Sequence, residues 1–529
     1  MTDTADSKIP DSDRPGSVTR GSVTPGSSTR DSVTRDFRSY LAALEELGDL
    51  QRVSRVIDPD LEASAVTRRS TENGRPAPFF EHLKGVEEGF RMVGAPGALS
   101  SIPGHPLARI SLSLGLPHTT TAAELVERLA RAGTGELLPP RRVPSAGAPC
   151  KQHVLTGEDA GLDRFPIPVV HQGDGGPYVN TWGVVVARTP DGRWTNWAIS
   201  RIMQIDGRHM TGLVLPGQHL GMIWREWEAI GEPMPYAVFQ GGDPGAAVVG
   251  GMTVPTEVDE GAYLGAVLGR PVDVVKCETN DLEVPASAEV VIEGRLSATR
   301  DAVEGPFAEF HGWALPETSP QPLFGIDAIT YRDDPIWPLA PAGRPVDDSH
   351  VAPAAGISAE VVSELRKAGL PVTSAWLPLR AACFWTVITV PSDWHDLLPG
   401  MDTARFVHRI GEVLNGTRVG RLSPVVYVLD DDVDPANDSD LLWALATRVH
   451  PSLRQEQWHG PIMPWYPCFT EEELHGGWGA VVVHDALLPA EGHGRAPQAT
   501  FEGVFPADLR ARVLAAEAGT PEAEAAPGA

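Results

Sequence analysis

Two stretches of this sequence gather the polar side chains around which the chain is organised. The first runs Asn196-Trp-Ala-Ile-Ser-Arg201 and continues, through a segment rich in glycine and apolar residues, to Leu215-Pro-Gly-Gln-His219. The second is Glu304-Gly-Pro-Phe-Ala-Glu309, which carries two carboxylates. We predict that the two stretches face each other across one pocket, which the rest of the chain builds and closes.

The sequence around these stretches is rich in predicted strands. Residues 181–188 and 194–200 flank a Pro-Asp-Gly-Arg turn, a pattern typical of a β-hairpin. Residues 210–215 and 289–293 add further strands, and one helix, at 258–268, is expected to interrupt them. Many strands with few helices favour a barrel or sandwich-like central domain.

Both flanks of this centre alternate helices with strands. On the N-terminal side, a helix begins after Asp36 and stops near Gly48, before a strand at 52–57 and a helix at 61–72. On the C-terminal side, three helices and two strands alternate, at residues 358–368, 383–390, 402–414, 425–429 and 440–449. The fold class is therefore α/β (α+β).

Changes of composition divide the chain into five parts. Residues 1–35 lack the apolar side chains needed to offset ordering entropy, so we expect them to be disordered. A helix at 121–132 and a proline-rich crossing at 138–144 mark the first domain boundary. The expected parts are a disordered extension at 1–35, an N-terminal α/β domain at 36–120, a central domain at 121–335, a C-terminal α/β domain at 336–510 and a flexible tail at 511–529.

Composition excludes several classes of partner. The chain has 43 Lys and Arg against 70 Asp and Glu, a net charge of −27, which argues against nucleic acid and against an anionic membrane. The four cysteines form no Cys-x-x-Cys pair, so neither a disulfide framework nor a cysteine zinc site is expected. With no leader-like apolar segment and no apolar run of about 18 residues, we expect a cytoplasmic protein.

Six polar residues suggest chemistry when they are taken together. A hard divalent cation binds amide and carboxylate oxygens together with imidazole, a set that Asn196, His219 and Glu260 can supply. An arginine between two carboxylates can hold one ionised while the other exchanges a proton. Each residue also has a purely structural reading, as a core histidine, a solvated glutamate or an ion pair, and spacing alone leaves both readings open.

Other motifs in the sequence give little information about function. No Walker A, His-Glu-x-x-His or Gly-x-Ser-x-Gly motif occurs in the sequence. The segment Gly173-Asp-Gly-Gly176 is glycine-rich but does not match a dinucleotide fingerprint. Asp430-Asp-Asp432-Val-Asp434 is similar to a calcium loop, yet Pro435 stands where the turn needs glycine, so a strand end and a helix cap are expected there.

The chain resembles the UbiD family of reversible decarboxylases, and within it the ferulic acid decarboxylase branch. The resemblance covers about residues 36–510 in a consistent order. Its motifs are Thr195-Asn-Trp-Ala-Ile-Ser-Arg201, His209-Met-Thr-Gly212, Pro216-Gly-Gln-His219, Lys276-Cys-Glu-Thr-Asn-Asp-Leu-Glu-Val-Pro285 and Glu304-Gly-Pro-Phe-Ala-Glu-Phe-His-Gly312.

The resemblance implies a prenylated FMN cofactor, with Mn²⁺ or Mg²⁺ at its phosphate and K⁺ nearby. By motif position, Asn196, His219 and Glu260 match the divalent-metal ligands, and Arg201, Glu304 and Glu309 match the catalytic network. The positions implied for cofactor binding are Thr181, Asn196, Ala198, Ile199, Ser200, Arg201, Gln218, His219, Met252 and Glu260. The implied fold has an N-terminal α/β segment, a split-barrel flavin domain and a C-terminal α/β domain that oligomerises, as a homodimer or larger.

The implied reaction is non-oxidative decarboxylation of an α,β-unsaturated or (hetero)aromatic carboxylic acid. The cofactor supplies an electron sink while CO₂ leaves, and Glu309 donates the proton to the carbon that lost CO₂. A separate flavin prenyltransferase has to supply the cofactor. Two alternatives stay open: an enzyme of the 4-hydroxybenzoate or vanillate type, and a non-catalytic flavin-binding scaffold. The substrate, the direction of the reaction and the oligomer size are not determined by the sequence.

The sequence departs from the family pattern in two segments. Gly250-Gly251-Met252 replaces small hydroxyl residues ahead of methionine, so side-chain contacts with the flavin are lost there. The family usually has a lysine in the segment 418–424, where this chain offers Arg418 or Arg421 as a substitute. Leu215, Gln218 and Phe310 are candidates for shaping the pocket.

Overall fold

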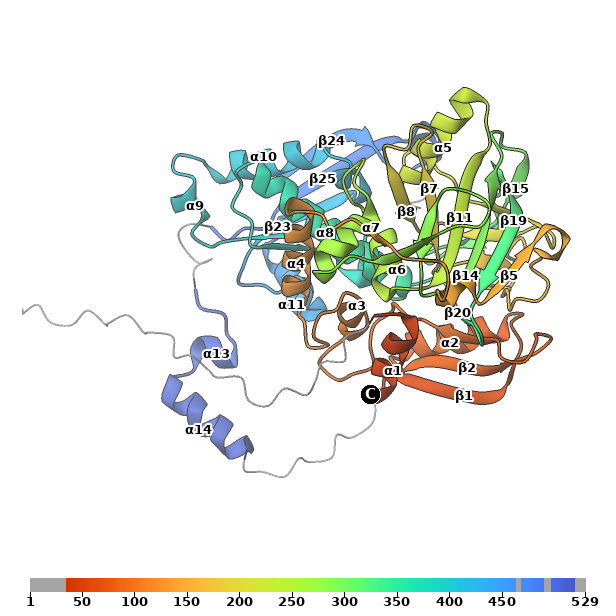
Figure 1. Ribbon diagram of the computed structural model, residues 1–529. Helices are drawn as coiled ribbons and strands as arrows, with labels where there is room; N and C mark the ends of the chain where they lie inside the picture. Colours follow the sequence, from red (N-terminus) through yellow and green to blue (C-terminus); the bar gives the residue numbers. More distant parts are fainter. Residues whose placement is uncertain (1–34, 463–467, 490–495, 519–529) are drawn as a thin grey trace, which may run out of the picture.

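The computed structural model describes residues 35–462, 468–489 and 496–518 (Figure 1). Its three main β-sheets have four, nine and five strands, and helices pack around them. This mixture of helices and strands confirms the predicted α/β (α+β) class. The disorder predicted for residues 1–34 and the tail predicted at 519–529 lie outside the described residues.

The N-terminal unit is a four-stranded sheet with helices packed against it. Its elements are α1 (Phe37–Glu46), β1 (Leu50–Ile57), α2 (Glu62–Glu72), β2 (Ala77–Leu83), β3 (Arg91–Gly94) and α3 (Ala108–Ser113). Asp36 caps α1 by accepting a hydrogen bond from the Ser39 N–H (2.8 Å), and Gly48 follows the helix with φ +75°, as the sequence predicted. The fourth strand is β20 (Ile336–Leu339), which our boundary assigns to the C-terminal domain but which pairs with β3.

The central sheet has nine strands and curls into a half-barrel (Figure 1). Its order is β6-β9-β10-β19-β14-β11-β7-β8, with β5 added beside β19. β7 pairs with β8 antiparallel, which confirms the predicted hairpin. The strands are β5 (His153–Thr156), β6 (Tyr178–Asn180), β7 (Val184–Arg188), β8 (Thr195–Ala198), β9 (Ile202–Gln204), β10 (His209–Gly212), β11 (Met234–Gly241), β14 (Ala288–Leu296) and β19 (Leu323–Tyr331).

Short strands extend this domain around the central sheet. β4 (Arg141–Arg142), β12 (Asp273–Lys276) and β13 (Glu283–Pro285) form a three-stranded sheet. β15 (Ala302–Glu304) pairs with β18 (Ser319–Gln321), and β16 (Phe307–Ala308) pairs with β17 (Ala314–Leu315). These two ribbons carry the acidic stretch that the sequence singled out.

The prediction that a single helix, at 258–268, interrupts the central strands was wrong. The predicted helix is present as α7 (Glu260–Leu268), but α5 (His219–Ile230) and α6 (Pro244–Gly250) accompany it. The N-cap of α5, Gln218, makes no side-chain capping bond, so the usual start signal is missing. α6 is short and buried on nearly all sides, and such a helix shows no amphipathic period.

The C-terminal domain is a five-stranded sheet with helices around it. Its strand order is β21-β22-β23-β25-β24. Its elements are α8 (Asp348–Lys367), β21 (Ser374–Trp376), β22 (Trp385–Val390), α9 (Trp394–Leu397), α10 (Thr403–Asn415), β23 (Val425–Asp430), α11 (Asp438–Arg448), β24 (Gln455–Pro461), α12 (Glu471–Gly476) and β25 (Trp478–Asp485). The predicted alternation of helices and strands is confirmed, although the sequence did not predict β21, β24 and β25.

Helix α8 begins at Asp348 and not at residue 358 as predicted. Pro353 lies inside it, and a proline in a helix interior removes one backbone hydrogen bond, which hid the first turns from the sequence analysis. α4 (Ala122–Thr134), capped by Thr121, packs beside α8. One hydrophobic core accordingly runs from Leu125 in α4 through Leu264 in α7 and Val351 in α8 to the C-terminal sheet.

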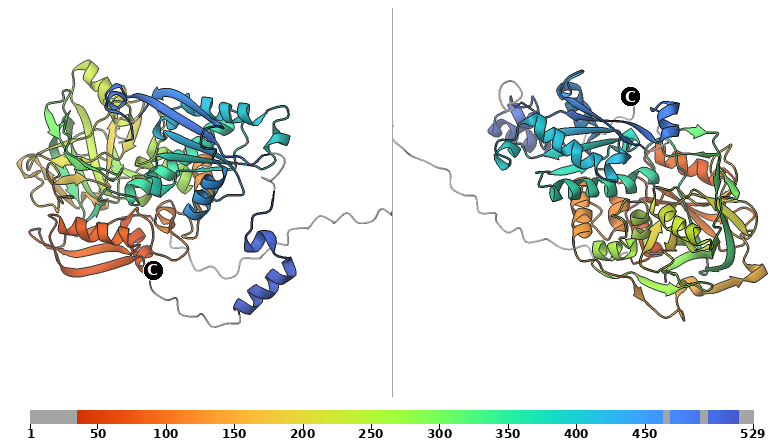
Figure 2. Two further views of the ribbon diagram at one scale, coloured as in Figure 1. Left: turned by 180° about the vertical axis from the view of Figure 1, so that it is seen from behind. Right: turned by 90° about the horizontal axis from the view of Figure 1, so that it is seen from above.

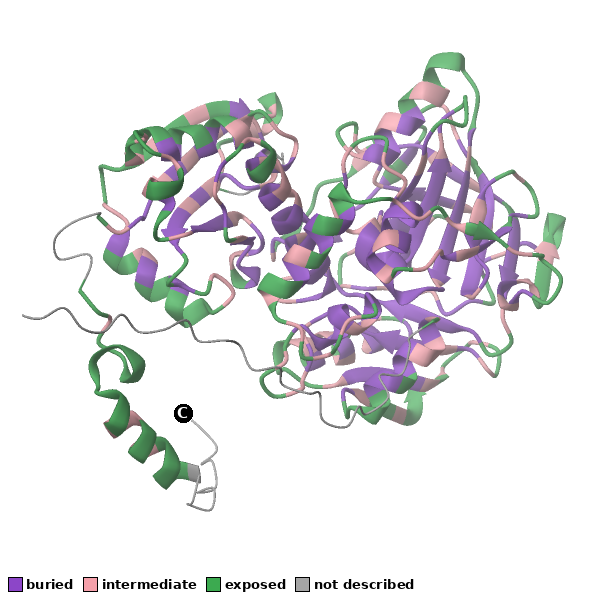
Figure 3. Ribbon diagram, turned by 60° about the vertical axis from the view of Figure 1, so that its left-hand side comes forward, coloured by how far each residue is buried: buried purple, intermediate pink, exposed green. Residues whose placement is uncertain are grey.

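Helices α13 (Phe501–Val504) and α14 (Ala507–Ala518) lie apart from the body of the protein (Figures 1 and 2). Residues 511–518, predicted as part of a flexible tail, belong to α14. Figure 3 shows the buried residues concentrated in the sheets, whereas α13 and α14 are largely exposed. Among the described residues, no helix is long and apolar enough to span a membrane.

Candidate active site

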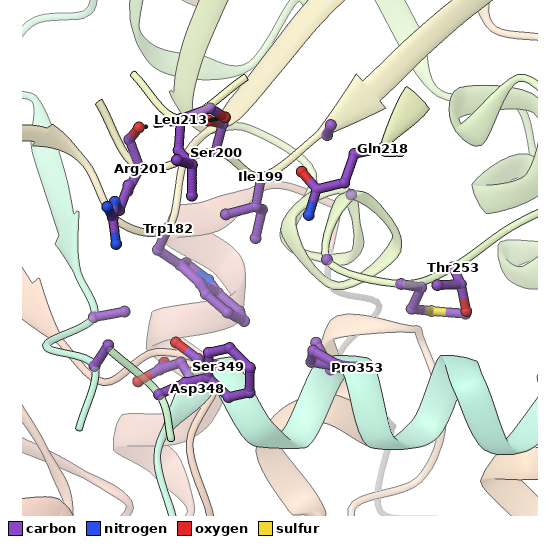
Figure 4. A pocket seen from close by; sticks show the side chains of 18 of the residues that line it. Trp182, Ile199, Ser200, Arg201, Leu213, Gln218, Thr253, Asp348, Ser349 and Pro353 are labelled. Atoms are coloured by element: carbon purple, nitrogen blue, oxygen red, sulfur yellow. Dashed lines mark hydrogen bonds between the residues drawn. The ribbon is translucent and has the colours of Figure 1, made fainter. Parts of the chain in front are cut away.

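A cavity of about 300 Å³ lies between the central half-barrel, α6 and the first turns of α8 (Figure 4). All of the residues that the resemblance implies for cofactor binding line it, namely Thr181, Asn196, Ala198, Ile199, Ser200, Arg201, Gln218, His219, Met252 and Glu260. Glu309 also lines the cavity, whereas Glu304 is fully buried behind it. The structure therefore brings the two predicted stretches together in one place.

One end of the cavity holds Asn196, His219 and Glu260. Glu260, the first residue of α7, accepts hydrogen bonds from Asn196 Nδ2 (2.7 Å) and from the Trp197 N–H (2.8 Å). His219, the first residue of α5, places Nδ1 3.2 Å from Glu260 Oε1. Since these residues come from β8, α5 and α7, only the tertiary fold brings them together.

The protonation of this cluster follows from its partners. Arg418 Nη1 lies 2.5 Å from His219 Nε2, and His219 Nδ1 lies 3.2 Å from Glu260 Oε1, so a cation bound by His219 would replace one of these two contacts. Burial, together with the Arg418 charge, lowers the pKa of His219 to about 3. Burial raises the pKa of Glu260 to about 8, against hydrogen bonds that favour its charged form.

This cluster fits a hard divalent cation. Asn196 Oδ1 is buried and has no hydrogen-bond partner among the described residues, so an oxygen acceptor is left over beside the Glu260 carboxylate. A cation would satisfy that oxygen and would offset the cost of burying the carboxylate. Among the described residues no group of three or more His, Cys, Asp or Glu side chains could hold a metal ion, and the set here consists of two such side chains and an amide.

The other end of the cavity is built on Arg201. Its guanidinium donates to Glu304 through Nε (2.9 Å) and Nη2 (2.7 Å), and its Nη1 pairs with Glu309. The Tyr178 hydroxyl donates a further bond to Glu304 Oε1 (2.9 Å). Burial opposes the charge of Arg201, but the two carboxylates outweigh it and hold its pKa above the ordinary value. Phe307 lies beneath the guanidinium, 5.2 Å from ring centroid to Cζ.

Short elements set these side chains in place. Arg201 stands between β8 and β9, and the neighbouring Ser200 hydroxyl donates to the Leu213 carbonyl (2.8 Å), a bond drawn in Figure 4. Glu304 ends β15, and Glu309 lies in the turn between β16 and β17. The sequence analysis predicted the three charged residues of this network. It missed Tyr178, because no motif in the sequence links this tyrosine to Glu304.

Sequence reasoning also missed the wall that α8 supplies. Asp348, Ser349 and Pro353 lie along one side of the cavity, below Trp182 in Figure 4. Their placement depends on how α8 packs across the central domain, which no local pattern reports. Of the pocket-shape candidates, Gln218 and Phe310 line the cavity, whereas the lining residue near Leu215 is Leu213.

The two unusual segments both reach the cavity. Gly250 and Gly251 line it, and the Gly250 carbonyl accepts from the Ile199 N–H (2.9 Å), so this segment meets the central sheet through its backbone. Arg418 lines the cavity and contacts His219, which favours Arg418 as the residue in the lysine position. The side chain of Arg421 lies outside the described part of the chain.

Three sequence models of the 3-octaprenyl-4-hydroxybenzoate carboxy-lyase (UbiD) family match the chain. The N-terminal domain matches residues 41–129, the Rift-related domain residues 141–345 and the C-terminal domain residues 350–495. The chain belongs to the UbiD family. As a member of that family it is a carboxy-lyase, and the resemblance found in the sequence is confirmed.

Relatives and solved structures agree with this assignment. The UbiD-family chain is 37% identical over 483 residues to pyrrole-2-carboxylic acid decarboxylase of Pseudomonas aeruginosa, covering 90% of this chain and 96% of that one. It is 37% identical over 429 residues to ferulic acid decarboxylase 1 of Saccharomyces cerevisiae, covering 79% and 84%.

Two solved UbiD-class structures share the fold. Vanillic acid decarboxylase of Sedimentibacter hydroxybenzoicus in its closed form has a TM-score of 0.78 at 26% identity, covering 92% of this chain and 99% of that one. HmfF of Pelotomaculum thermopropionicum in complex with FMN has a TM-score of 0.74 at 26% identity, covering 88% and 97%.

Gly356 of α8 tests how tightly the cavity wall is packed. A Cβ added there would lie 2.5 Å from Met252 Cβ, so Gly356→Ala must displace a residue that lines the cavity. We expect it to destabilise the protein by about 1–3 kcal/mol and to reduce bound flavin. Gly476→Ala, at the end of α12 with open space around it, is the matched control and should leave both unchanged. Thermal unfolding and flavin absorbance measure the two effects, and equal behaviour of the two variants would contradict the packing argument.

Proposed function

We propose that the protein catalyses the non-oxidative, reversible decarboxylation of an α,β-unsaturated or (hetero)aromatic carboxylic acid with prenylated FMN. The observation that carries the proposal is that one cavity contains two distinct polar clusters. Arg201 stands between two glutamates at one end, and Asn196, His219 and Glu260 form a cation-binding set at the other. The FMN complex of HmfF, and an evolved dimeric form of the same enzyme with prFMN, support the cofactor.

The polar cluster at the Asn196 end would hold the cofactor phosphate through Mn²⁺ or Mg²⁺, with K⁺ nearby. Asn196, His219 and Glu260 are the proposed cation ligands. Arg418 brings a positive charge to the same end of the cavity, where a phosphate would receive it. When bound, prenylated FMN supplies the electron sink that decarboxylation requires.

Glu309, and not Glu304, is the proposed proton donor. Glu304 is fully buried and already accepts three hydrogen bonds, from Arg201 Nε, Arg201 Nη2 and Tyr178, so it has no side facing a substrate. The Glu309 side chain is 25% exposed and lines the cavity. Its carboxyl gives a proton to the carbon that releases CO₂, and Arg201 orients the leaving carboxylate.

The cavity wall supports an acid with a flat apolar body. Trp182, Phe307 and Phe310 line it together with small aliphatic residues, and aromatic side chains pack well against planar ligands. The named substrates of the relatives, a pyrrole carboxylic acid and ferulic acid, have this character. A vanillate-type activity is the alternative within the family, supported by the fold shared with vanillic acid decarboxylase.

Three further proposals concern the supply of the cofactor, the assembly of the protein and its location. A flavin prenyltransferase supplies the cofactor, and the protein assembles as a homodimer or larger homo-oligomer through its C-terminal domain, as the dimeric form of HmfF supports. Free cysteines at 150, 277, 383 and 468 support a reducing, cytoplasmic location.

Mass spectrometry of the bound small molecule tests the cofactor. Protein co-expressed with a flavin prenyltransferase should release a molecule with the mass of prenylated FMN, and it should then produce CO₂ from one of a panel of unsaturated and heteroaromatic acids. Release of unmodified FMN, or of no flavin, in the presence of a working prenyltransferase would contradict the proposal.

Glu309→Gln tests whether Glu309 is the proton donor. The amide keeps the size of the side chain but cannot donate a carboxylic acid proton, so turnover should fall by at least about 10²-fold. Flavin content should stay at the wild-type level, because Glu309 lies at the Arg201 end of the cavity. Unchanged turnover would favour the alternative in which the proton comes from elsewhere.

Metal removal tests the cation set. Dialysis of the loaded protein against a chelator should release flavin, because Glu260 and Asn196 Oδ1 would lose the ion that links them to the phosphate. Absorbance of the protein fraction reports retained flavin without an activity assay, and added Mn²⁺ should restore binding. Full retention of flavin by metal-free protein would contradict the proposed ligands.

A further inference from the structure

The turn that carries Glu309 is held from two directions by Asp–His pairs. The first pair belongs to α8: Asp347 is the N-cap of the helix and His350 is its third residue, and both are buried. His350 Nε2 lies 2.7 Å from the carbonyl oxygen of Phe310, the residue that follows Glu309. Helix α8 is therefore fastened to the peptide group that joins Phe310 to His311, one residue beyond Glu309.

The second pair belongs to the glycine-rich segment ahead of β6. Asp174 Oδ1 accepts from the N–H of Ala308, the residue that precedes Glu309 (3.2 Å). His171 places Nδ1 3.1 Å from Asp174 Oδ2, and its Nε2 lies 2.8 Å from the carbonyl of Ala342, which lines the cavity. This segment holds the peptide group that joins Phe307 to Ala308, on the other side of Glu309.

Glycine in this segment is needed for close approach. The Gly175 N–H donates to the Pro306 carbonyl (2.8 Å), and a Cβ on Gly175 would lie 2.1 Å from the Gly305 carbonyl oxygen. Only glycine allows the two backbones to come this near. The glycine-rich run that matched no dinucleotide fingerprint thus has a structural purpose next to the proposed proton donor.

The tautomer of His350 follows from its partners. A carbonyl oxygen only accepts, so Nε2 carries the proton and donates it to Phe310. Nδ1 lies 3.1 Å from the Asp347 backbone N, a contact of the α8 capping box, and 3.0 Å from Asp347 Oδ1. Arg68 of α2 holds Asp347 Oδ2 at 2.8 Å, so the chain of contacts starts in the N-terminal unit.

We propose that His350 and Asp174 are positioning residues for proton transfer: they hold the two residues next to Glu309, Phe310 through its carbonyl and Ala308 through its N–H. The inference rests on the proposed function, in which the Glu309 carboxyl reaches the carbon that releases CO₂. Glu309 lies in a short turn, where its N–H donates to the Trp313 carbonyl (3.2 Å) and its carbonyl accepts from the Gly312 N–H (2.9 Å). Arg201 pairs with the end of its side chain. Since a displacement of about 1 Å can cost roughly 10²-fold in rate, the backbone clamp matters for turnover.

Kinetics of His350 variants test this inference on the flavin-loaded protein. His350→Ala removes the donor to Phe310, and we expect kcat to fall by about 10- to 100-fold with KM and flavin content near wild type. His350→Gln restores a donor near the Nε2 position and should recover most of the loss. Asp174→Ala, which acts on the Ala308 N–H, should lower kcat in the same way.

His153 provides the matched control. It also pairs with an aspartate, Asp333 (2.6 Å), but on the exposed surface, so His153→Ala should leave kcat unchanged. The solvent deuterium isotope effect on kcat should rise in His350→Ala, because proton delivery by Glu309 becomes slower while the rest of the cycle does not. A merely structural role would lower kcat and flavin content together and leave the isotope effect unchanged.

Several results would overturn the inference. They are a kcat of His350→Ala within about twofold of wild type, a loss of flavin that accounts for the loss of kcat, an unchanged isotope effect, or no recovery in His350→Gln. A wild-type protein that decarboxylates no acid would instead overturn the proposed function. An active wild type together with a fully active His350→Ala variant would overturn only the positioning role of His350 and leave the proposed function intact.

Discussion

The ion pair between the Arg201 guanidinium and the Glu304 carboxylate is the interaction on which the site depends. A fully buried carboxylate is costly unless a cation and hydrogen bonds compensate it, and Arg201 and Tyr178 supply both. Because Arg201 follows β8 while Glu304 ends β15, the same pair ties the curled central sheet to the acidic ribbon. The charge that stabilises this corner of the fold also sets the environment of Glu309.

Local signals in the sequence predicted the elements better than their arrangement. Helices α1, α4 and α10 begin at caps that the sequence displays, and the β7–β8 hairpin has a clear turn. The start of α8 was hidden by Pro353, and α6 shows no amphipathic period. β20 joins the first sheet across a long stretch of chain, which local periodicity cannot report.

The site shows the same division between local and long-range information. The ten residues that the resemblance named for cofactor binding, from Thr181 to Glu260, all line one cavity in the structure. The wall contributed by α8 and the contact of Arg418 with His219 come from another domain, so their effect depends on packing. The negative net charge argues against partners such as nucleic acid, but composition could not give the shape of the cavity.

The cavity draws its two kinds of wall from separate elements. Arg201, Glu304 and Glu309 come from the central sheet and its ribbons. Ala352, Pro353 and Ile357 line the same cavity from α8. Substitutions along one face of that helix can reshape the space for a different acid while Arg201, Glu304 and Glu309 stay unaltered. This architecture therefore allows substrate preference to change during evolution without a change in the acidic residues. His350 is different from the other residues of α8 because it contacts the Phe310 carbonyl beside Glu309.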